Sequence, residues 1–196
     1  MTGPRVGVLA LQGGVREHVT VLTDLGADVR LVRRPEDLAA VGGLVLPGGE
    51  SSVIDKLSRA FGLRDPLRAA IAEGMPVLGT CAGLILLADR LEDGIAGQQT
   101  LGGLDVTVRR NAFGSQTQSF ETDLEVAAVG EAPVHATFIR APIVSEVGPS
   151  VEAIARLPEG GIVGVRQGSL VGLSFHPELE GETRFHGLLL DAARRA

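Results

Sequence analysis

The sequence predicts an α/β fold in which a doubly wound, mostly parallel sheet is flanked by helices, with antiparallel strands added in the second half. Short apolar runs alternate with helical stretches in the first half of the chain, which indicates repeated strand and helix pairs. Hydrophobic residues make up 44% of the 196 residues but aromatic residues only 3%, so aliphatic side chains must fill the core, as in α/β packing. No linker or internal repeat is visible, and we expect one domain over residues 1–196.

The first half reads as strands followed by helices. Strands are predicted at residues 5–11, 28–32, 43–46 and 75–78, and helices at 15–25, 36–41, 64–73 and 84–91. Ser51 or Ser52 can cap a further helix that precedes residue 64. This regular alternation is what predicts the parallel sheet.

The second half of the chain contains shorter apolar runs, which are typical of strands and hairpins. A loop is predicted at 92–103, followed by strands at 104–108, 120–126, 134–139, 151–157, 162–166 and 170–175. Glycine pairs and Gln167-Gly168 mark turns between the later runs. The chain closes with a predicted helix over 183–195, whose consecutive leucines face the core.

Charge and cysteine content exclude several classes of function. Eighteen basic and 24 acidic residues give a net charge of −6, which argues against a protein that binds the phosphate backbone of nucleic acids. One cysteine cannot form an internal disulfide and does not support a cysteine zinc site, so we expect the reducing cytoplasm. No apolar run approaches the roughly 18 residues of a membrane span, and the apolar run near the start is too short for a signal peptide.

The lone cysteine, Cys81, lies between a predicted strand and a predicted helix. The pattern Gly79-x-Cys81-x-Gly83 is the layout of a nucleophile elbow, in which glycines allow a tight turn. The positive end of the following helix favours a thiolate there. A lone cysteine also commonly packs as a small apolar side chain, so the rest of the chain has to decide.

His176-Pro177-Glu178 follows the last predicted strand, at the same edge of the sheet as Cys81. Proline disfavours the helical conformation at His176, and in an extended chain residues two apart point to the same side, so Glu178 can reach the imidazole. A carboxylate on one ring nitrogen leaves the other free to exchange a proton with a thiol. The alternative is an exposed turn with a solvated glutamate.

The loop Gly48-Gly49-Glu50 follows the third predicted strand and faces the same edge. Read alone, it is a turn with a charge that suits a helix start. Together with Cys81, a backbone N–H of Gly49 and that of Ala82 can form an oxyanion hole.

The remaining polar residues point to no cofactor. His18, His135 and His186 are interpreted as structural or exposed, while Arg110 and Arg140 each close a strand and by default form surface ion pairs. Ligand spacing for a metal is not recognisable, and no phosphate-binding glycine motif is present. We therefore expect neither a metal nor a cofactor.

These motifs resemble the class I, triad-type glutamine amidotransferases. The resemblance rests on residues 47–51 (PGGES), 79–83 (GTCAG) and 175–178 (FHPE). Residues 11–18 (LQGGVREH), 110–114 (RNAFG) and 138–142 (FIRAP) are similar to the branch that serves pyridoxal 5′-phosphate synthases as glutaminase subunits. Two residues depart from that branch, Gly14 where alanine is frequent and Ser115 where arginine is frequent, and both concern the subunit interface.

The resemblance implies a flavodoxin-like sheet and a glutaminase that passes ammonia to a synthase subunit, within a large hetero-oligomeric complex that makes pyridoxal 5′-phosphate. It implies a triad of Cys81, His176 and Glu178, and an interface residue linked to activation, Gln12. The positions that match those holding L-glutamine are Gly48, Gly49, Glu50, Arg110, Ile139 and Arg140.

Two other functions remain open. The same triad would serve a general amidase or cysteine peptidase that acts without a partner. The fold can also carry a catalytically silent binding module, although the presence of Cys81, His176 and Glu178 speaks against it.

Overall fold

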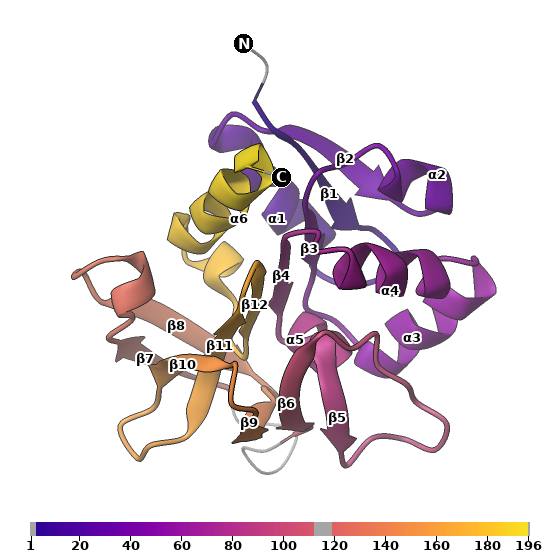
Figure 1. Ribbon diagram of the computed structural model, residues 1–196. Coiled ribbons are helices and arrows are strands. Elements are labelled where there is room, and N and C mark those ends of the chain that lie inside the picture. The colour runs from indigo at the N-terminus through magenta and orange to yellow at the C-terminus, as the bar shows by residue number, and fades with distance from the viewer. Residues whose placement is uncertain (1–2, 112–118, 196) are drawn as a thin grey trace.

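The computed structural model describes residues 3–111 and 119–195. Its main feature is a ten-stranded sheet with the order β2-β1-β3-β4-β12-β11-β9-β6-β5, in which β10 pairs with β11 (Figure 1). These strands are β1 (Arg5–Leu9), β2 (Asp28–Val32), β3 (Leu44–Leu46), β4 (Val77–Thr80), β5 (Ala88–Glu92), β6 (Leu104–Arg109), β9 (Ile143–Val147), β10 (Glu152–Arg156), β11 (Ile162–Gln167) and β12 (Leu170–Leu173). A separate two-stranded sheet pairs β7 (Ser119–Leu124) with β8 (Val134–Ile139).

The parallel part of the large sheet contains β2, β1, β3, β4 and β12, each parallel to its neighbour. β12 comes from late in the chain and inserts beside β4, with Leu173 opposite Thr80. The carboxyl ends of β3, β4 and β12 therefore meet at one edge. β11, β9 and β6 continue the sheet in antiparallel pairings. The predicted fold class, a doubly wound sheet with antiparallel additions, is confirmed.

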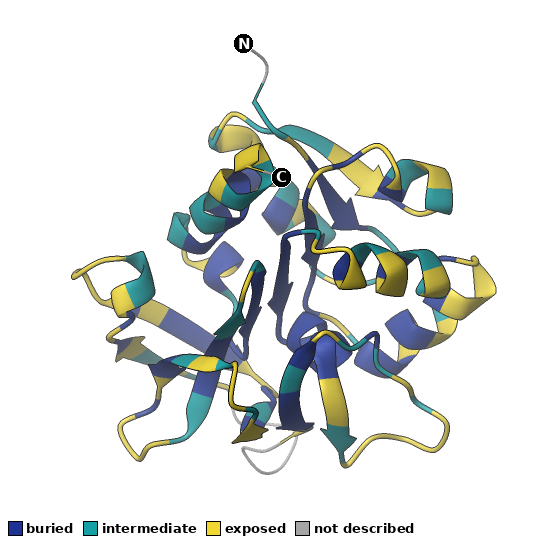
Figure 2. Ribbon diagram, in the orientation of Figure 1, coloured by how far each residue is buried: buried dark blue, intermediate teal, exposed yellow. Residues whose placement is uncertain are grey.

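Helices cover both faces of the sheet (Figure 1). They are α1 (Val15–Asp24), α2 (Pro35–Leu38), α3 (Ser51–Ala60), α4 (Arg64–Ala72), α5 (Ala82–Leu87) and α6 (Arg184–Arg195), with the 3₁₀ turns η1 (Ala127–Val129) and η2 (Pro177–Leu179). One core cluster includes side chains of α2 to α5, and the other includes side chains of α1, α6 and the small sheet. The central strands are buried between them (Figure 2).

β3 shows how the two cores are built. Leu44 and Leu46 belong to one cluster and Val45 to the other, because successive strand side chains point to opposite faces. All three are fully buried. This explains why the central strands are apolar without interruption, as the sequence indicates.

Three local expectations are wrong. The helix expected over 84–91 ends at Leu87, and the next residues form β5, which pairs in parallel with β6. The sequence does not predict β9, although this strand joins β6 to β11. Helix α3 is capped by Glu50, whose carboxylate accepts a hydrogen bond from the N–H of Ser52 at 3.3 Å, and the two serines are its first helical residues.

A shallow hollow opens beside the segment that follows β1. It is lined by Ala10, Leu11, Leu31, Arg33, Arg34, Asp37 and Phe61. Phe61 follows α3 and its side chain is 55% exposed. Within residues 3–111 and 119–195, no helix has the length and apolar character needed to cross a membrane.

Candidate active site

Cys81 sits at a sharp corner between β4 and α5. Its backbone has φ 49° and ψ −101°, a conformation with positive φ that is costly for any residue other than glycine. Its N–H donates to the carbonyl of Leu173 on β12, at 2.7 Å, which anchors the corner to the neighbouring strand. The side chain is 8% exposed. The fold therefore tolerates backbone strain at the residue that presents this one sulfur.

The two glycines that flank the corner are required by close packing. A Cβ on Gly83 would lie 2.0 Å from the carbonyl oxygen of Leu46, and a Cβ on Gly79 would lie 2.7 Å from the backbone of Gly83. Neither glycine has a positive φ; the residue with that conformation is Cys81 itself. The glycines thus allow the tight turn by leaving room for close backbone packing, and the strain lies at the cysteine between them.

His176 and Glu178 form a buried pair beside this corner. Nδ1 of His176 lies 2.8 Å from Oε1 of Glu178, and the carboxylate side chain is only 1% exposed. His176 has φ −113° and ψ 82°, outside the helical region as expected before proline, but Pro177–Leu179 is a 3₁₀ turn. The contact thus arises from a turn that folds Glu178 back, and not from alternation along an extended chain.

The charges of this pair are set by its surroundings. Burial alone would lower the pKa of His176, but hydrogen bonds to Cys81 and Glu178 outweigh it and raise the pKa to about 10. Burial alone would raise the pKa of Glu178, but the hydrogen bond to His176 and the positive charge of that imidazolium lower it. An imidazolium and a carboxylate side by side are therefore the stable state at neutral pH.

The Gly48-Gly49-Glu50 loop packs directly on the triad residues. A Cβ on Gly48 would lie 2.3 Å from Cε1 of His176 and 3.4 Å from Cβ of Cys81, so only glycine fits there. Ala82 is the first residue of α5, where N–H groups have no partner within the helix. Gly48, Ala82 and the triad thus share one small volume.

Gln12 and Gly13 hold this loop from the side of β1. Oε1 of Gln12 accepts a hydrogen bond from the N–H of Glu50 at 2.8 Å. Gly13 has φ 105°, and a Cβ there would lie 1.9 Å from the carbonyl oxygen of Gly48. The N–H of Gly14 donates to that same carbonyl at 3.0 Å. The loops after β1 and β3 are therefore in direct backbone contact.

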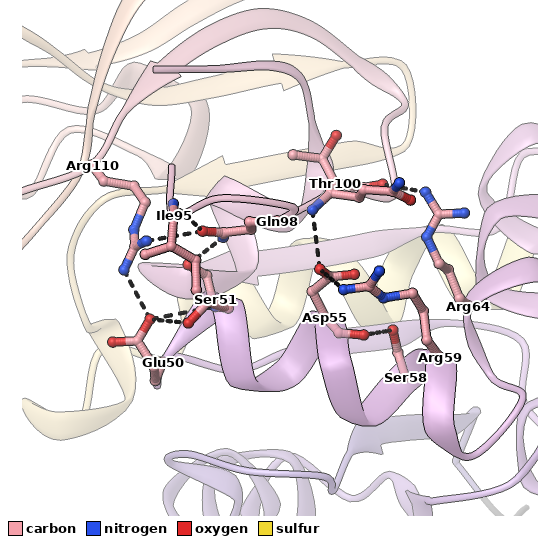
Figure 3. Close-up of polar contacts among 12 residues, drawn as sticks. Glu50, Ser51, Asp55, Ser58, Arg59, Arg64, Ile95, Gln98, Thr100 and Arg110 are labelled. Carbon is pink, nitrogen blue, oxygen red and sulfur yellow. Dashed lines mark hydrogen bonds and ion pairs between the residues drawn. The ribbon is translucent and has the colours of Figure 1, made fainter. Parts of the chain in front are cut away.

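Glu50 and Arg110 form an ion pair at the mouth of the site. Oε1 of Glu50 lies 2.8 Å from Nη2 of Arg110, and Nη1 of Arg110 donates to Oε1 of Gln98 at 2.9 Å (Figure 3). Gln98 in turn donates to Oγ of Ser51 at 2.9 Å. The N–H of Gln99 binds Asp55 on α3. The segment before β6 is thereby fastened along α3 and holds the guanidinium of Arg110 in place.

Ile139 and Arg140 close the other side of the sulfur. Sγ of Cys81 lies 4.0 Å from the carbonyl oxygen of Ile139, which ends β8. Arg140 is exposed and has φ 46°, the second strained non-glycine backbone near the sulfur. Of the motif at 110–114, Ala112, Phe113 and Gly114 lie outside the described residues, as does Ser115.

Sequence reasoning missed a row of buried polar side chains behind the triad. Nε2 of His18 lies 3.5 Å from Oε1 of Glu178 and 3.2 Å from Oγ1 of Thr80, and Nδ1 lies 2.9 Å from Nε2 of His186. Both histidines are fully buried. His135 is exposed on β8 beside Asp123 and Glu121, as expected. No spacing signal in the sequence could have joined residues on α1, η2 and α6.

Metal ligation finds no support in the part of the chain that the structure describes. Within residues 3–111 and 119–195, no three His, Cys, Asp or Glu side chains are grouped so that they could hold an ion. The chemistry available at this edge is that of a thiol, an imidazole and a carboxylate.

Comparison with known sequences gives matches over nearly the whole chain. The profile of the SNO glutamine amidotransferase family matches residues 8–194. A relative in Clavibacter michiganensis subsp. michiganensis (strain NCPPB 382), named pyridoxal 5′-phosphate synthase subunit PdxT, is 63% identical over 194 residues, covering 99% of this chain and 93% of its own. The subunit of that name in Leifsonia xyli subsp. xyli (strain CTCB07) is 65% identical over 187 residues, covering 95% and 94%.

Comparison with solved structures also gives glutamine amidotransferases. The crystal structure of a glutamine amidotransferase superposes with a TM-score of 0.89 at 46% identity and covers 96% of this chain and 98% of the other. A glutamine amidotransferase from Thermotoga maritima has a TM-score of 0.63 at 16% identity and covers 100% of this chain and 92% of its own, which is a likeness of fold alone.

Proposed function

Since the chain belongs to the SNO glutamine amidotransferase family, we propose that it hydrolyses the side-chain amide of L-glutamine to L-glutamate and ammonia through Cys81, His176 and Glu178. The observation that carries this proposal is the imidazole of His176, which is hydrogen-bonded to a buried carboxylate and packs against Gly48 together with Cys81, the sole thiol of the chain. A thiol, an imidazole and a carboxylate in that order form a nucleophile, a proton carrier and its orienting group.

The reaction runs in two halves. The Cys81 thiolate attacks the amide carbon, and the N–H groups of Gly49 and Ala82 stabilise the oxyanion. The imidazolium of His176 gives its proton to the leaving nitrogen, so ammonia departs and a thioester forms. His176 then takes a proton from water, which attacks the thioester carbon; glutamate leaves, and the thiolate and imidazolium are restored.

The amino-acid end of glutamine is proposed to bind at the Glu50–Arg110 ion pair, with Arg140, which follows Ile139 beside Cys81, as a further contact. Glu50 and Arg110 present a carboxylate and a guanidinium side by side, which suits an α-amino and an α-carboxylate group. Gly48, Gly49 and Ile139 supply close-fitting backbone around the side-chain amide, since Gly48 packs on the triad and the Ile139 carbonyl lies against Cys81.

We further propose that the ammonia serves pyridoxal 5′-phosphate synthesis and that the partner is the synthase subunit. The support is the name of relatives that match almost the entire chain. Gln12 lies beside the active-site loop and would belong to the docking edge that controls activity. A single cysteine suits a reducing compartment, so the reaction is placed in the cytoplasm.

The test is ammonia release from L-glutamine, measured with and without the synthase subunit for the parent, Cys81→Ala and His176→Ala. Both variants should lose activity by at least about 10⁴-fold, because each removes a member of a unit that acts together. His135→Ala, which removes an exposed histidine on β8, is the matched control and should keep the parent rate. A Cys81→Ala protein with near-parent turnover would contradict the assignment.

The same assay separates the alternatives. A partner-independent amidase would be equally fast without the synthase and would also cleave other amides, such as asparagine. A binding module would release no ammonia under either condition.

A further inference from the structure

The triad carboxylate has a second imidazole behind it, which the mechanism above does not use. Oε1 of Glu178 is 2.8 Å from His176 on one side and 3.5 Å from Nε2 of His18 on the other. Oε2 of the same carboxylate is buried and has no hydrogen-bond partner among the described residues. A buried carboxylate needs donors to remain ionised and in one orientation, so both imidazoles bear on Oε1.

His18 also contacts the strand that delivers the nucleophile. The same Nε2 lies 3.2 Å from Oγ1 of Thr80, the residue that immediately precedes Cys81. One ring nitrogen on α1 therefore faces both the last residue of β4 and the carboxylate on η2. Displacement of His18 would release the two from each other.

We propose that His18 is a positioning residue of the active site, which carries its proton on Nε2 and uses it to hold the Glu178 carboxylate against the Cys81 strand. This inference rests on the proposed glutaminase function of the same site. It adds a residue that the catalytic steps do not touch directly but on which the geometry of the triad depends.

The position of the proton follows from the neighbouring charge. A proton on Nε2 faces the Glu178 carboxylate, whereas a lone pair there would face an anion. Nδ1 is then an acceptor, and Nε2–H of His186 donates to it across 2.9 Å. The remaining ring nitrogen, Nδ1 of His186, makes no hydrogen bond among the described residues, so it need not carry a proton.

Both histidines act as neutral groups. Burial is the main cause that lowers the pKa of His18, and burial is also the main cause that lowers the pKa of His186, to about 4. The charged groups facing His18 are Glu17 on its own helix, and His176 and Glu178 at η2. His186 on α6 also faces His18, and Glu182 lies near His186. The carboxylate of Glu180 accepts a hydrogen bond from the hydroxyl of Thr137 on β8. His18 therefore faces Glu178 with a neutral imidazole N–H, 3.5 Å from the carboxylate oxygen, rather than with a second positive charge.

The test compares His18→Leu with His18→Gln in the complex with the synthase subunit, with kcat and KM for glutamine measured across pH. Loss of the N–H donor favours the protonated form of Glu178. The acid limb of the profile of kcat against pH should therefore move up by about one pH unit, and kcat should fall several-fold. KM should stay within about twofold, since His18 does not face the substrate. The amide of His18→Gln can present an N–H at the place of Nε2, so this variant should restore the acid limb. His135→Leu makes the same replacement on the exposed strand β8 and should change neither.

The proposal is overturned if His18→Leu keeps the parent acid limb, or if His18→Gln loses as much as His18→Leu. ¹⁵N NMR of the histidine rings in the parent gives an answer that needs no variant to fold. A proton found on Nδ1 of His18 rules the proposal out, and one on Nε2 supports it. A parent protein that releases no ammonia would instead refute the proposed function, while the NMR result would stand independently.

Discussion

In the proposed mechanism His176 lies between the nucleophile Cys81 and the orienting carboxylate of Glu178, and its charge state follows from them. Burial works against the charged ring, but Cys81 and Glu178 raise the pKa to about 10, so the proton that ammonia needs on leaving is already in place at neutral pH. The pKa is raised on folding, so the linked stability is fully present below the usual histidine value of about 6.5 and is lost as the pH rises through about 10.

The alkaline limb of kcat/KM for glutamine should report this group. We expect activity to hold through the neutral range and to fall only as the pH approaches about 10. Glu178→Gln should move the limb to lower pH, because it removes the carboxylate that stabilises the imidazolium, and should lower turnover by less than His176→Ala does. A parent limb near pH 7, or an unshifted limb in Glu178→Gln, would contradict this account.

The sequence points to the proposed triad but not to what lies behind it. The elbow around Cys81 and the adjacency of His176 and Glu178 are local patterns, so they are visible in the chain. The contact of His18 with Glu178 joins α1 to η2, and it exists only because both elements pack on the same face of the sheet. Its only trace in the sequence is a polar residue among the positions of α1 that are buried.

Among the elements, α5 is the most tightly constrained. Gly83 lies against the backbone of β3, where a Cβ would come 2.0 Å from the carbonyl oxygen of Leu46. Gly83→Ala must push the helix away from the sheet, and Cys81 with it, so we expect a loss of about 1–3 kcal/mol in the free energy of unfolding and a large loss of activity. Gly187→Ala in α6, where a Cβ meets nothing within 4 Å, should instead gain about 0.5–1 kcal/mol. Urea denaturation measures the free energy of unfolding of both variants, and equal changes in the two would refute this expectation.

The segment between β5 and β6 positions Arg110 through Gln98, whose side chain forms hydrogen bonds with both Arg110 and Ser51. Gln98→Ala should raise KM for glutamine about three- to tenfold with little change in kcat, because the substrate loses a prepositioned guanidinium. Gln99→Ala is the control, since Gln99 binds Asp55 through its backbone N–H and keeps that bond. Steady-state kinetics with the synthase subunit test this prediction. A lowered kcat at unchanged KM would argue instead that Gln98 has a role in the chemical steps.

β5 shows where element prediction stops. Residues 88–92 have a composition that permits a helix, and nothing local forbids its continuation from α5. The strand forms because β6 offers a parallel partner, and that pairing is non-local. By contrast, the central strands are predictable because their uninterrupted apolar runs reflect burial on both faces.

On the scale of the whole molecule, we propose that control depends on the contact between the loops after β1 and β3. Gln12 fixes the N–H of Glu50, next to Gly49, whose N–H we place in the oxyanion hole. Loss of one oxyanion donor costs about 10²–10³ in rate, so a partner that presses on this edge can switch catalysis. We expect weak activity for the isolated chain, strong stimulation by the synthase subunit, and loss of most stimulation in Gln12→Ala.

Kinetics of the isolated parent, the complex and the Gln12→Ala complex test this side by side. Arg194→Ala, on the exposed end of α6, serves as the control and should be stimulated like the parent. An isolated chain as fast as the complex would rule this form of control out.

The exposed Phe61 in the hollow beside the β1 loop has a practical consequence for spectroscopy. The chain contains no Trp and no Tyr, so it is almost silent in the near ultraviolet. Phe61→Trp would install a single indole at a rim that Ala10 and Leu11 share, next to Gln12 in the chain. Its emission would start at the long wavelength of a water-exposed fluorophore, and a blue shift on titration with the synthase subunit would report docking at this edge without any enzymatic turnover.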